Sequence, residues 1–150
     1  MRRGVRAPGR LQGDQGLALR VFLALSALVW LPYGIYCFFM PESLAESAGL
    51  GAMSATGTTE LRAMYGGLQT AIGVMAAIAV FRQSLRRPAL VSLAFLTLGL
   101  GAGRLLGLAL DGAVTSYTGG AVVFEFASAA AAIWFHAREV ASLPARSVAS

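Results

Sequence analysis

Four long apolar runs constrain this sequence more than any other feature. They cover residues 21–40, 61–81, 88–110 and 119–136. A helix needs about 20 predominantly apolar residues to cross the hydrocarbon core of a bilayer, and each run approaches that length. Hydrophobic residues make up 57% of the chain and charged residues 13%, whereas soluble domains average about 25% charged residues. The sequence therefore predicts an all-α integral membrane protein, an antiparallel four-helix bundle.

The arginines predict how these spans are oriented, because positive residues concentrate on the cytoplasmic side of a membrane. The 12 positive residues are all arginines. Most of them flank the apolar runs on one side: Arg2, Arg3, Arg6, Arg10, Arg20, Arg82, Arg86, Arg87, Arg138 and Arg146. The loops 41–60 and 111–118 contain no arginine. We therefore expect a bacterial inner-membrane protein with both termini in the cytoplasm. The net charge of +5 follows this topological pattern, so nucleic acid is not an expected partner.

The chain is expected to contain a flexible basic cytoplasmic tail over residues 1–19, a membrane domain over 20–137 and a second cytoplasmic tail over 138–150. The first span is longer than the 7–15-residue apolar region of a signal peptide and contains Pro32, so cleavage is not expected. In the loop 41–59, an early proline, early acids and a terminal glycine predict a short surface helix. Residues 53–59 are expected to be irregular, with Thr59 as the N-cap of the second span.

Cysteine and histidine usage limits the chemistry of the chain. Cys37 is the single cysteine, which excludes an intrachain disulfide, a cysteine-rich zinc site and a CxxC redox pair. His136, the single histidine, lies beside Arg138 at the end of the fourth span and is interpreted as an interfacial residue. We expect no catalytic residue, no metal and no cofactor.

Two charged residues, Arg104 and Glu125, interrupt the third and fourth runs. Arg104 precedes Asp111 by seven residues, which places it roughly 10 Å inward from the outer surface. Counted from Gly119, Glu125 reaches a depth of about 9 Å on the same side. A charge inside a bilayer costs about 3 kcal/mol or more, and it normally turns inward and pairs. We therefore predict a bidentate salt bridge between Arg104 and Glu125.

A wider polar cluster is predicted around this pair. Helical spacing places polar residues of the second span on one face, and we expect the cluster to comprise Glu60, Arg62, Tyr65, Gln69, Arg104, Asp111 and Glu125. Two interpretations remain open. In the first, the cluster holds the helices together, as buried polar residues do in membrane bundles. In the second, it is a small site that opens outward, where the arginines bind an anion, a quinone oxygen or a lipid head group.

Small residues mark places where helices can approach closely. Gly99, Gly103 and Gly107 form consecutive GxxxG steps in the third span. Such steps allow close packing either within the bundle or in a homodimer. The second span offers a similar set, namely Gly66, Gly67 and Gly73. The expected partners are therefore the lipid bilayer and, through the GxxxG face, a second copy of the chain.

A family resemblance rests on the polar residues named above. The segment ELRAMYGGLQ at 60–69, RLLG at 104–107, Asp111-Gly112 and Glu125 resemble bacterial domain-of-unknown-function family 4345. The resemblance covers roughly residues 20–137 and implies a compact four-span membrane protein in which these polar residues matter; it implies no activity. A more distant similarity, in size and span number, is to DoxX-like membrane proteins, some of which are linked to quinone or thiol oxidation.

The sequence favours a non-enzymatic multi-pass protein whose polar cluster, near the outer face, is structural or binds a small ligand or lipid. The alternative is a membrane oxidoreductase or redox accessory protein, DoxX-like, that interacts with a quinone. A co-purifying quinone, or a pocket beside Arg104, would favour the alternative. A closed Arg104–Glu125 bridge with no cavity would favour a structural role.

Overall fold

The computed structural model describes residues 8–112 and 114–141. Every regular element in these two ranges is helical, which confirms the predicted all-α class. In chain order the elements are α1 Pro8–Phe39, α2 Ser43–Ala48, α3 Ala55–Leu61, the π-helix η1 Arg62–Gly67, α4 Leu68–Phe81, the 3-10 helix η2 Gln83–Leu85, α5 Arg86–Asp111 and α6 Ser116–Ala141.

Within the described residues, four helical segments are long and apolar enough to cross a membrane: Gln15–Phe39, Ala55–Phe81, Gln83–Asp111 and Ser116–Ala141. Each contains one of the four predicted runs almost entirely. Large apolar side chains such as Phe39, Phe81 and Leu110 are exposed on these helices. Water would penalise such surfaces, whereas lipid accommodates them. The chain is therefore a multi-pass membrane protein.

Helix extends into both predicted tails. α1 starts at Pro8, a residue suited to a first turn because its missing N–H would be unpaired there in any case. Residues 8–19, which were expected to belong to a flexible tail, extend the first helix. α6 likewise continues to Ala141, beyond the predicted boundary at 137. The rest of the two predicted tails, 1–7 and 142–150, lies outside the described residues.

The connection after α1 differs in part from its prediction. The short helix is present as α2, and it ends at Gly49, whose φ of 69° favours glycine. Residues 53–59 were predicted to be irregular, but helix α3 begins at Ala55. Its N-cap is Ser54, whose Oγ accepts a hydrogen bond from the backbone N–H of Gly57 at 3.1 Å. Thr59, the predicted cap, instead lies inside the helix and donates its hydroxyl to the Ala55 carbonyl at 3.1 Å.

The second span contains a π-helix that the sequence pattern did not predict. α3 passes into η1 and then into α4, so Ala55–Phe81 is one apolar helical segment with a wider turn inside it. A π-turn bonds residue i to i+5 and so adds a residue to the turn. The constant helical spacing assumed from Arg62 to Gly73 is therefore interrupted. The wider turn coincides with RAMYGG, the centre of the motif that carries the family resemblance.

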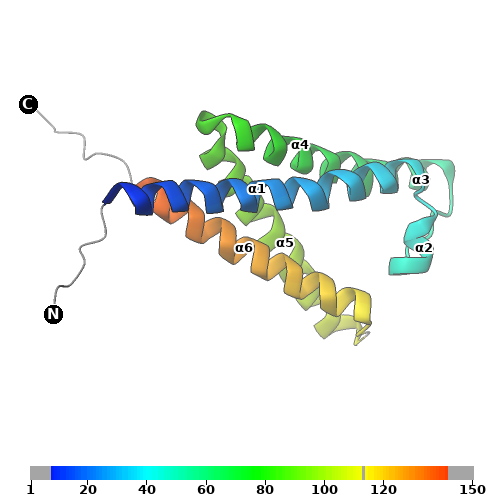
Figure 1. Cartoon of the computed structure of the whole chain (residues 1–150). Helices are drawn as coiled ribbons and strands as arrows, with labels where there is room; N and C mark the ends of the chain where they lie inside the picture. The colour runs from blue at the N-terminus through cyan, green and yellow to red at the C-terminus, as the bar shows by residue number, and fades with distance from the viewer. Residues whose placement is uncertain (1–7, 113, 142–150) are drawn as a thin grey trace, which may run out of the picture. The chain divides into compact units, whose positions relative to one another are not determined.

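The chain divides into two compact units, and each is described by itself. The first contains α1, α3, η1 and α4, and the second contains α5 and α6. α1 packs on α4 in the first unit, and α5 packs on α6 in the second (Figure 1). Both helix pairs are antiparallel, since Leu31 meets Gly73 while Phe38 meets Gly66, and Arg104 meets Glu125 while Arg87 meets Glu139.

Glycines let α1 and α4 approach at backbone distance. A Cβ built on Gly66 would lie 2.7 Å from the Phe38 Cα, and one on Gly73 would lie 2.7 Å from the Leu31 Cα. Real Cβ atoms almost never come so close, so no larger residue fits without movement of a backbone. Gly34 of α1 meets the Thr70 backbone of α4 in the same way. The predicted close packing is thus confirmed for Gly66 and Gly73, whereas Gly67 contacts only its own helix.

The α5–α6 pair buries one stripe of each helix. Leu90, Leu93 and Thr97 are buried on α5, and Ala129 and Ala132 are buried on α6. The small alanines and Gly101 keep the two helices close. A Cβ on Gly101 would lie 2.9 Å from the ring of Phe126. This packing brings the second half of α5 alongside the first half of α6.

Candidate functional site

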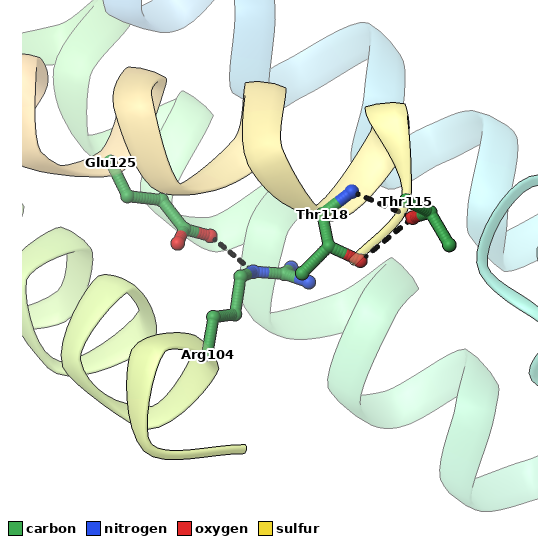
Figure 2. A network of polar contacts seen from close by, with 4 residues as sticks. All are labelled: Arg104, Thr115, Thr118 and Glu125. Atoms are coloured by element: carbon green, nitrogen blue, oxygen red, sulfur yellow. Dashed lines mark hydrogen bonds and ion pairs between the residues drawn. The ribbon is translucent and has the colours of Figure 1, made fainter. Parts of the chain in front are cut away.

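An ion pair joins α5 to α6 within the second unit. The Nε of Arg104 donates a hydrogen bond to Oε1 of Glu125 at 2.8 Å. The Glu125 side chain is 4% exposed and the Arg104 side chain 24% exposed. Figure 2 shows the two side chains extending toward each other from facing helices. The partner predicted from the depth of each residue along its span is therefore the partner that Arg104 has.

Local packing explains why these two side chains meet. Arg104 follows Thr97 and Gly101 at helical spacing, and those two residues are buried. Glu125 begins the stripe that Ala129 and Ala132 continue on α6. Gly101 lets the Phe126 ring approach α5 one turn away from the ion pair. Because the helices are in contact there, the guanidinium reaches the carboxylate without leaving the helix pair.

Only one oxygen of the carboxylate is used. Oε2 of Glu125 is buried and has no hydrogen-bond partner among the described residues, so the prediction of a bidentate bridge is wrong. By contrast, the buried hydroxyl of Thr97 is satisfied, since it donates to the Leu93 carbonyl at 2.7 Å. A buried acceptor without a partner costs about 1–3 kcal/mol, and more if it is charged. The α5–α6 pair therefore contains one well-positioned acceptor that nothing in the described chain satisfies.

Residues at the start of α6 lie near the Arg104 guanidinium. The sequence pattern had not predicted them as site residues. The Cζ of Arg104 lies 5.8 Å from the centre of the Tyr117 ring, which is within reach of a cation–π contact. Thr118 precedes Glu125 by two helical turns and so shares its face. Thr115 caps the helix: its Oγ1 accepts from the Thr118 N–H at 3.1 Å, and the two hydroxyls lie 2.9 Å apart (Figure 2).

A spacing signal for these residues was present in the sequence. The fourth span was predicted to begin at Gly119, which left Tyr117 and Thr118 in a loop. α6 begins at Ser116, so both residues lie in its first turn. Threonine is a favoured N-cap residue, and assigning Thr115 as the cap would have placed the two residues on the helix.

The remaining predicted site residues occupy different environments. Glu60 and Asp111 are exposed, whereas Arg62 and Tyr65 are half-buried. Gln69 on α4 is 7% exposed, and its Oε1 has no hydrogen-bond partner among the described residues. Of the seven residues, Glu60, Arg62, Tyr65 and Gln69 belong to the first unit and Arg104, Asp111 and Glu125 to the second. That all seven form one polar cluster stays a prediction.

Two further features bear on ligand binding. Within 8–112 and 114–141 no group of three His, Cys, Asp or Glu side chains is placed to hold a metal ion. The α1–α4 pair carries an apolar groove of about 320 Å³ between residues 24–32 and 77–81. This groove offers space for a hydrocarbon chain but no polar group to orient a ligand. The ion pair is therefore the stronger candidate site.

The GxxxG face of α5 is open in the described chain. A Cβ built on Gly99 or Gly103 meets nothing within 4 Å, and one on Gly107 meets only Asp111 of the same helix. Within the α5–α6 unit, these glycines therefore do not mediate contact with the other helix. Homodimerisation through this face stays a prediction.

Comparison with known proteins identifies one family. The family model described as domain of unknown function (DUF4345) matches residues 18–136. No curated protein and no solved structure matches the chain. The more distant likeness to DoxX-like proteins stays a prediction.

Proposed function

The chain belongs to the DUF4345 family, and we propose that it is a non-enzymatic protein of the bacterial inner membrane that binds a small polar ligand at Glu125. The observation that carries this proposal is the buried Oε2 of Glu125, which has no partner among the described residues. Buried polar atoms in native proteins are nearly always hydrogen-bonded, so one that is not calls for a ligand or a water molecule.

The geometry specifies the chemistry of such a ligand. The 2.8 Å bond from Arg104 to Oε1 fixes the carboxylate and therefore the position of Oε2. An ionised carboxylate only accepts hydrogen bonds, so the ligand must present a hydroxyl or N–H donor. The same bond joins α5 to α6. The Arg104–Glu125 ion pair therefore also contributes to holding the two helices together.

Mass spectrometry of the purified protein tests the proposal. We expect a small molecule or lipid to co-purify with the wild type, and its amount to fall about tenfold or more in Glu125→Gln, because a hydrogen bond to a charged group is lost. Glu42→Gln is the matched control, since Glu42 is an exposed loop carboxylate. Equal amounts in both variants and in the wild type would overturn the proposal. If no compound co-purifies with the wild type in stoichiometric amount, the Arg104–Glu125 ion pair has a structural role only.

The quinone-linked alternative has its own test. A quinol hydroxyl can donate to Oε2, whereas a quinone carbonyl cannot. We therefore expect a short-chain quinol to raise the melting temperature more than the matching quinone, and this difference to vanish in Glu125→Gln. Turnover of the quinol by the protein would favour the oxidoreductase alternative over simple binding. Equal effects of both redox forms would argue against binding of a quinol at Oε2.

Labelling of single cysteines tests the proposed orientation. Cys37 is 1% exposed and gives little background. With both termini in the cytoplasm, Ser47→Cys faces outward and Ser84→Cys faces inward. A membrane-impermeant thiol reagent applied to intact spheroplasts is expected to label the first variant only. Labelling of Ser84→Cys alone would show that the orientation is the opposite of the one proposed.

A further inference from the structure

We infer that the opposite end of the α5–α6 pair, formed by the first turn of α5 and the last turns of α6, binds a phosphate group. This site is separate from Glu125 and does not depend on the ligand proposed there. It consists of Arg86 and Arg87 on α5 and of His136 and Arg138 on α6. Four observations on these residues support it.

The first observation is the placement of positive charge at the wrong end of a helix. α5 begins at Arg86 and Arg87, its N-cap Leu85 makes no side-chain hydrogen bond, and no acidic residue lies in the first turn. The N-terminus of a helix carries partial positive charge, so two arginines there repel it. An anion bound at this end would reverse that repulsion, because helix N-termini and arginines both favour phosphate.

The second observation is that Arg86 is buried. Its residue is 6% exposed, and its Nε has no hydrogen-bond partner among the described residues. Arg86 continues the buried stripe of Leu90, Leu93 and Thr97 at helical spacing. A buried guanidinium is costly unless it is paired. The side chain therefore has an unused donor on the face that α5 presents to α6.

The third observation lies on the facing helix. His136 follows Glu125, Ala129 and Ala132 on the stripe that α6 presents to α5. Its Nδ1 is buried and has no hydrogen-bond partner among the described residues. The antiparallel pairing puts the last turns of α6 beside the start of α5. An unsatisfied imidazole nitrogen and an unsatisfied guanidinium nitrogen thus belong to the same end of the pair.

The fourth observation is that the flanking arginines are held in place. Arg87 Nη2 donates a hydrogen bond to the Glu139 backbone carbonyl at 2.7 Å, which joins the start of α5 to the end of α6. The Cζ of Arg138 lies 3.9 Å from the centre of the Trp134 ring. Tryptophan and arginine together are typical of the membrane interface, where lipid phosphates lie. Basic pockets between spans at this depth bind anionic head groups.

The test compares lipids on the full-length protein in detergent. We expect native mass spectrometry to show retained phosphatidylglycerol in preference to phosphatidylcholine. Arg86→Gln should reduce that retention about fivefold, the factor that one arginine contributes near an anionic surface. Arg82→Gln is the matched control, because Arg82 lies just before α5 and is exposed. Equal retention by Arg86→Gln and the wild type, or an equal loss in both variants, would overturn the inference.

A second arm identifies the source of the phosphate. Inorganic phosphate that raises the melting temperature of the lipid-depleted protein as much as phosphatidylglycerol does would assign the site to a free anion. An effect of phosphatidylglycerol alone would assign it to a lipid head group. If Arg86→Gln does not fold, His136→Ala provides the same comparison, since it removes the second unsatisfied nitrogen without removing an arginine. Unchanged binding of both probes in that variant would contradict the inference.

Discussion

The two helix pairs of this protein are held together in different ways. α1 meets η1 and α4 through glycines, with backbones so close that no side chain fits between Gly73 and Leu31 or between Gly66 and Phe38. α5 and α6 combine small-residue packing with charged contacts, the Arg104–Glu125 bridge toward one end and the Arg87–Glu139 carbonyl bond at the other. In lipid, burial of apolar surface contributes little to association between helices, so packing and polar contacts must supply it. The α1–α4 pair relies mainly on packing, whereas the α5–α6 pair adds polar contacts to its packing.

Because of this difference, the two helix pairs tolerate different substitutions. A pair held by close backbones is sensitive to added volume and insensitive to charge. A pair held by a buried ion pair is sensitive to the loss of one partner, because the other charge remains in an apolar environment. It also keeps polar groups inside the membrane, where they can bind a ligand. The candidate ligand sites of the chain accordingly lie on α5–α6.

The largest effect is expected where a buried charge loses its partner. Glu125→Ala leaves the Arg104 guanidinium stranded and should lower the free energy of unfolding by about 3 kcal/mol. Glu42→Ala, which removes an exposed carboxylate, should leave it unchanged. Denaturation in mixed detergent, followed by tryptophan fluorescence, measures both. Equal midpoints for the two variants would show that the bridge does not hold α5 on α6.

A smaller loss is expected from volume added to the other pair. Gly73→Ala places a methyl group against the Leu31 backbone and should cost about 2 kcal/mol, as overpacking does. Gly103→Ala is the matched control, because its methyl group meets nothing within 4 Å. The control should be neutral or slightly stabilising, since alanine favours helix more than glycine does. A destabilisation of both variants by the same amount would mean that helix propensity, and not the close approach, sets the result.

The next largest effect on the free energy of unfolding is expected from the interaction between Arg104 and Glu125. If the cost of Glu125→Ala comes from a stranded charge, removal of that charge should recover part of it. The double variant Arg104→Ala/Glu125→Ala should therefore be about 1 kcal/mol more stable than Glu125→Ala alone. The same detergent titration measures this difference. A double variant less stable than either single variant would indicate that the side chains contribute by packing and not by charge.

The sequence predicted those parts of the fold that follow from simple counting. The four spans follow from the length of the apolar runs, and the Arg104–Glu125 pair follows from equal depth along two antiparallel helices. Depth is a one-dimensional quantity, so it identified the partners but not their geometry. The bidentate contact required knowledge of how the two helices are rotated, and the structure shows a single Nε–Oε1 bond instead.

Other features could not be counted in this way. The π-helix at 62–67 packs against α1, and no residue pattern in RAMYGG identifies it. The predicted cap at Thr59 was reasonable from local sequence, yet Ser54 starts the helix earlier. Arg86, which is buried, and His136, which is half-buried with a buried Nδ1, were assigned to the membrane surface because charged residues at span ends usually lie there. Only three-dimensional packing distinguishes a surface arginine from one with an unsatisfied buried nitrogen.

The smallest effect on stability is expected from a substitution on the GxxxG face of α5. It tests whether glycines allow close packing between two chains as well as within one chain. Gly103 has open space around it, so Gly103→Ile should change the free energy of unfolding of one chain by less than about 0.5 kcal/mol. If the GxxxG face pairs with a second copy, the same change should convert a dimer into a monomer. Light scattering on the protein in detergent measures the mass of each form. A monomeric wild type, or a variant that stays dimeric, would confine close glycine packing to the α1–α4 pair.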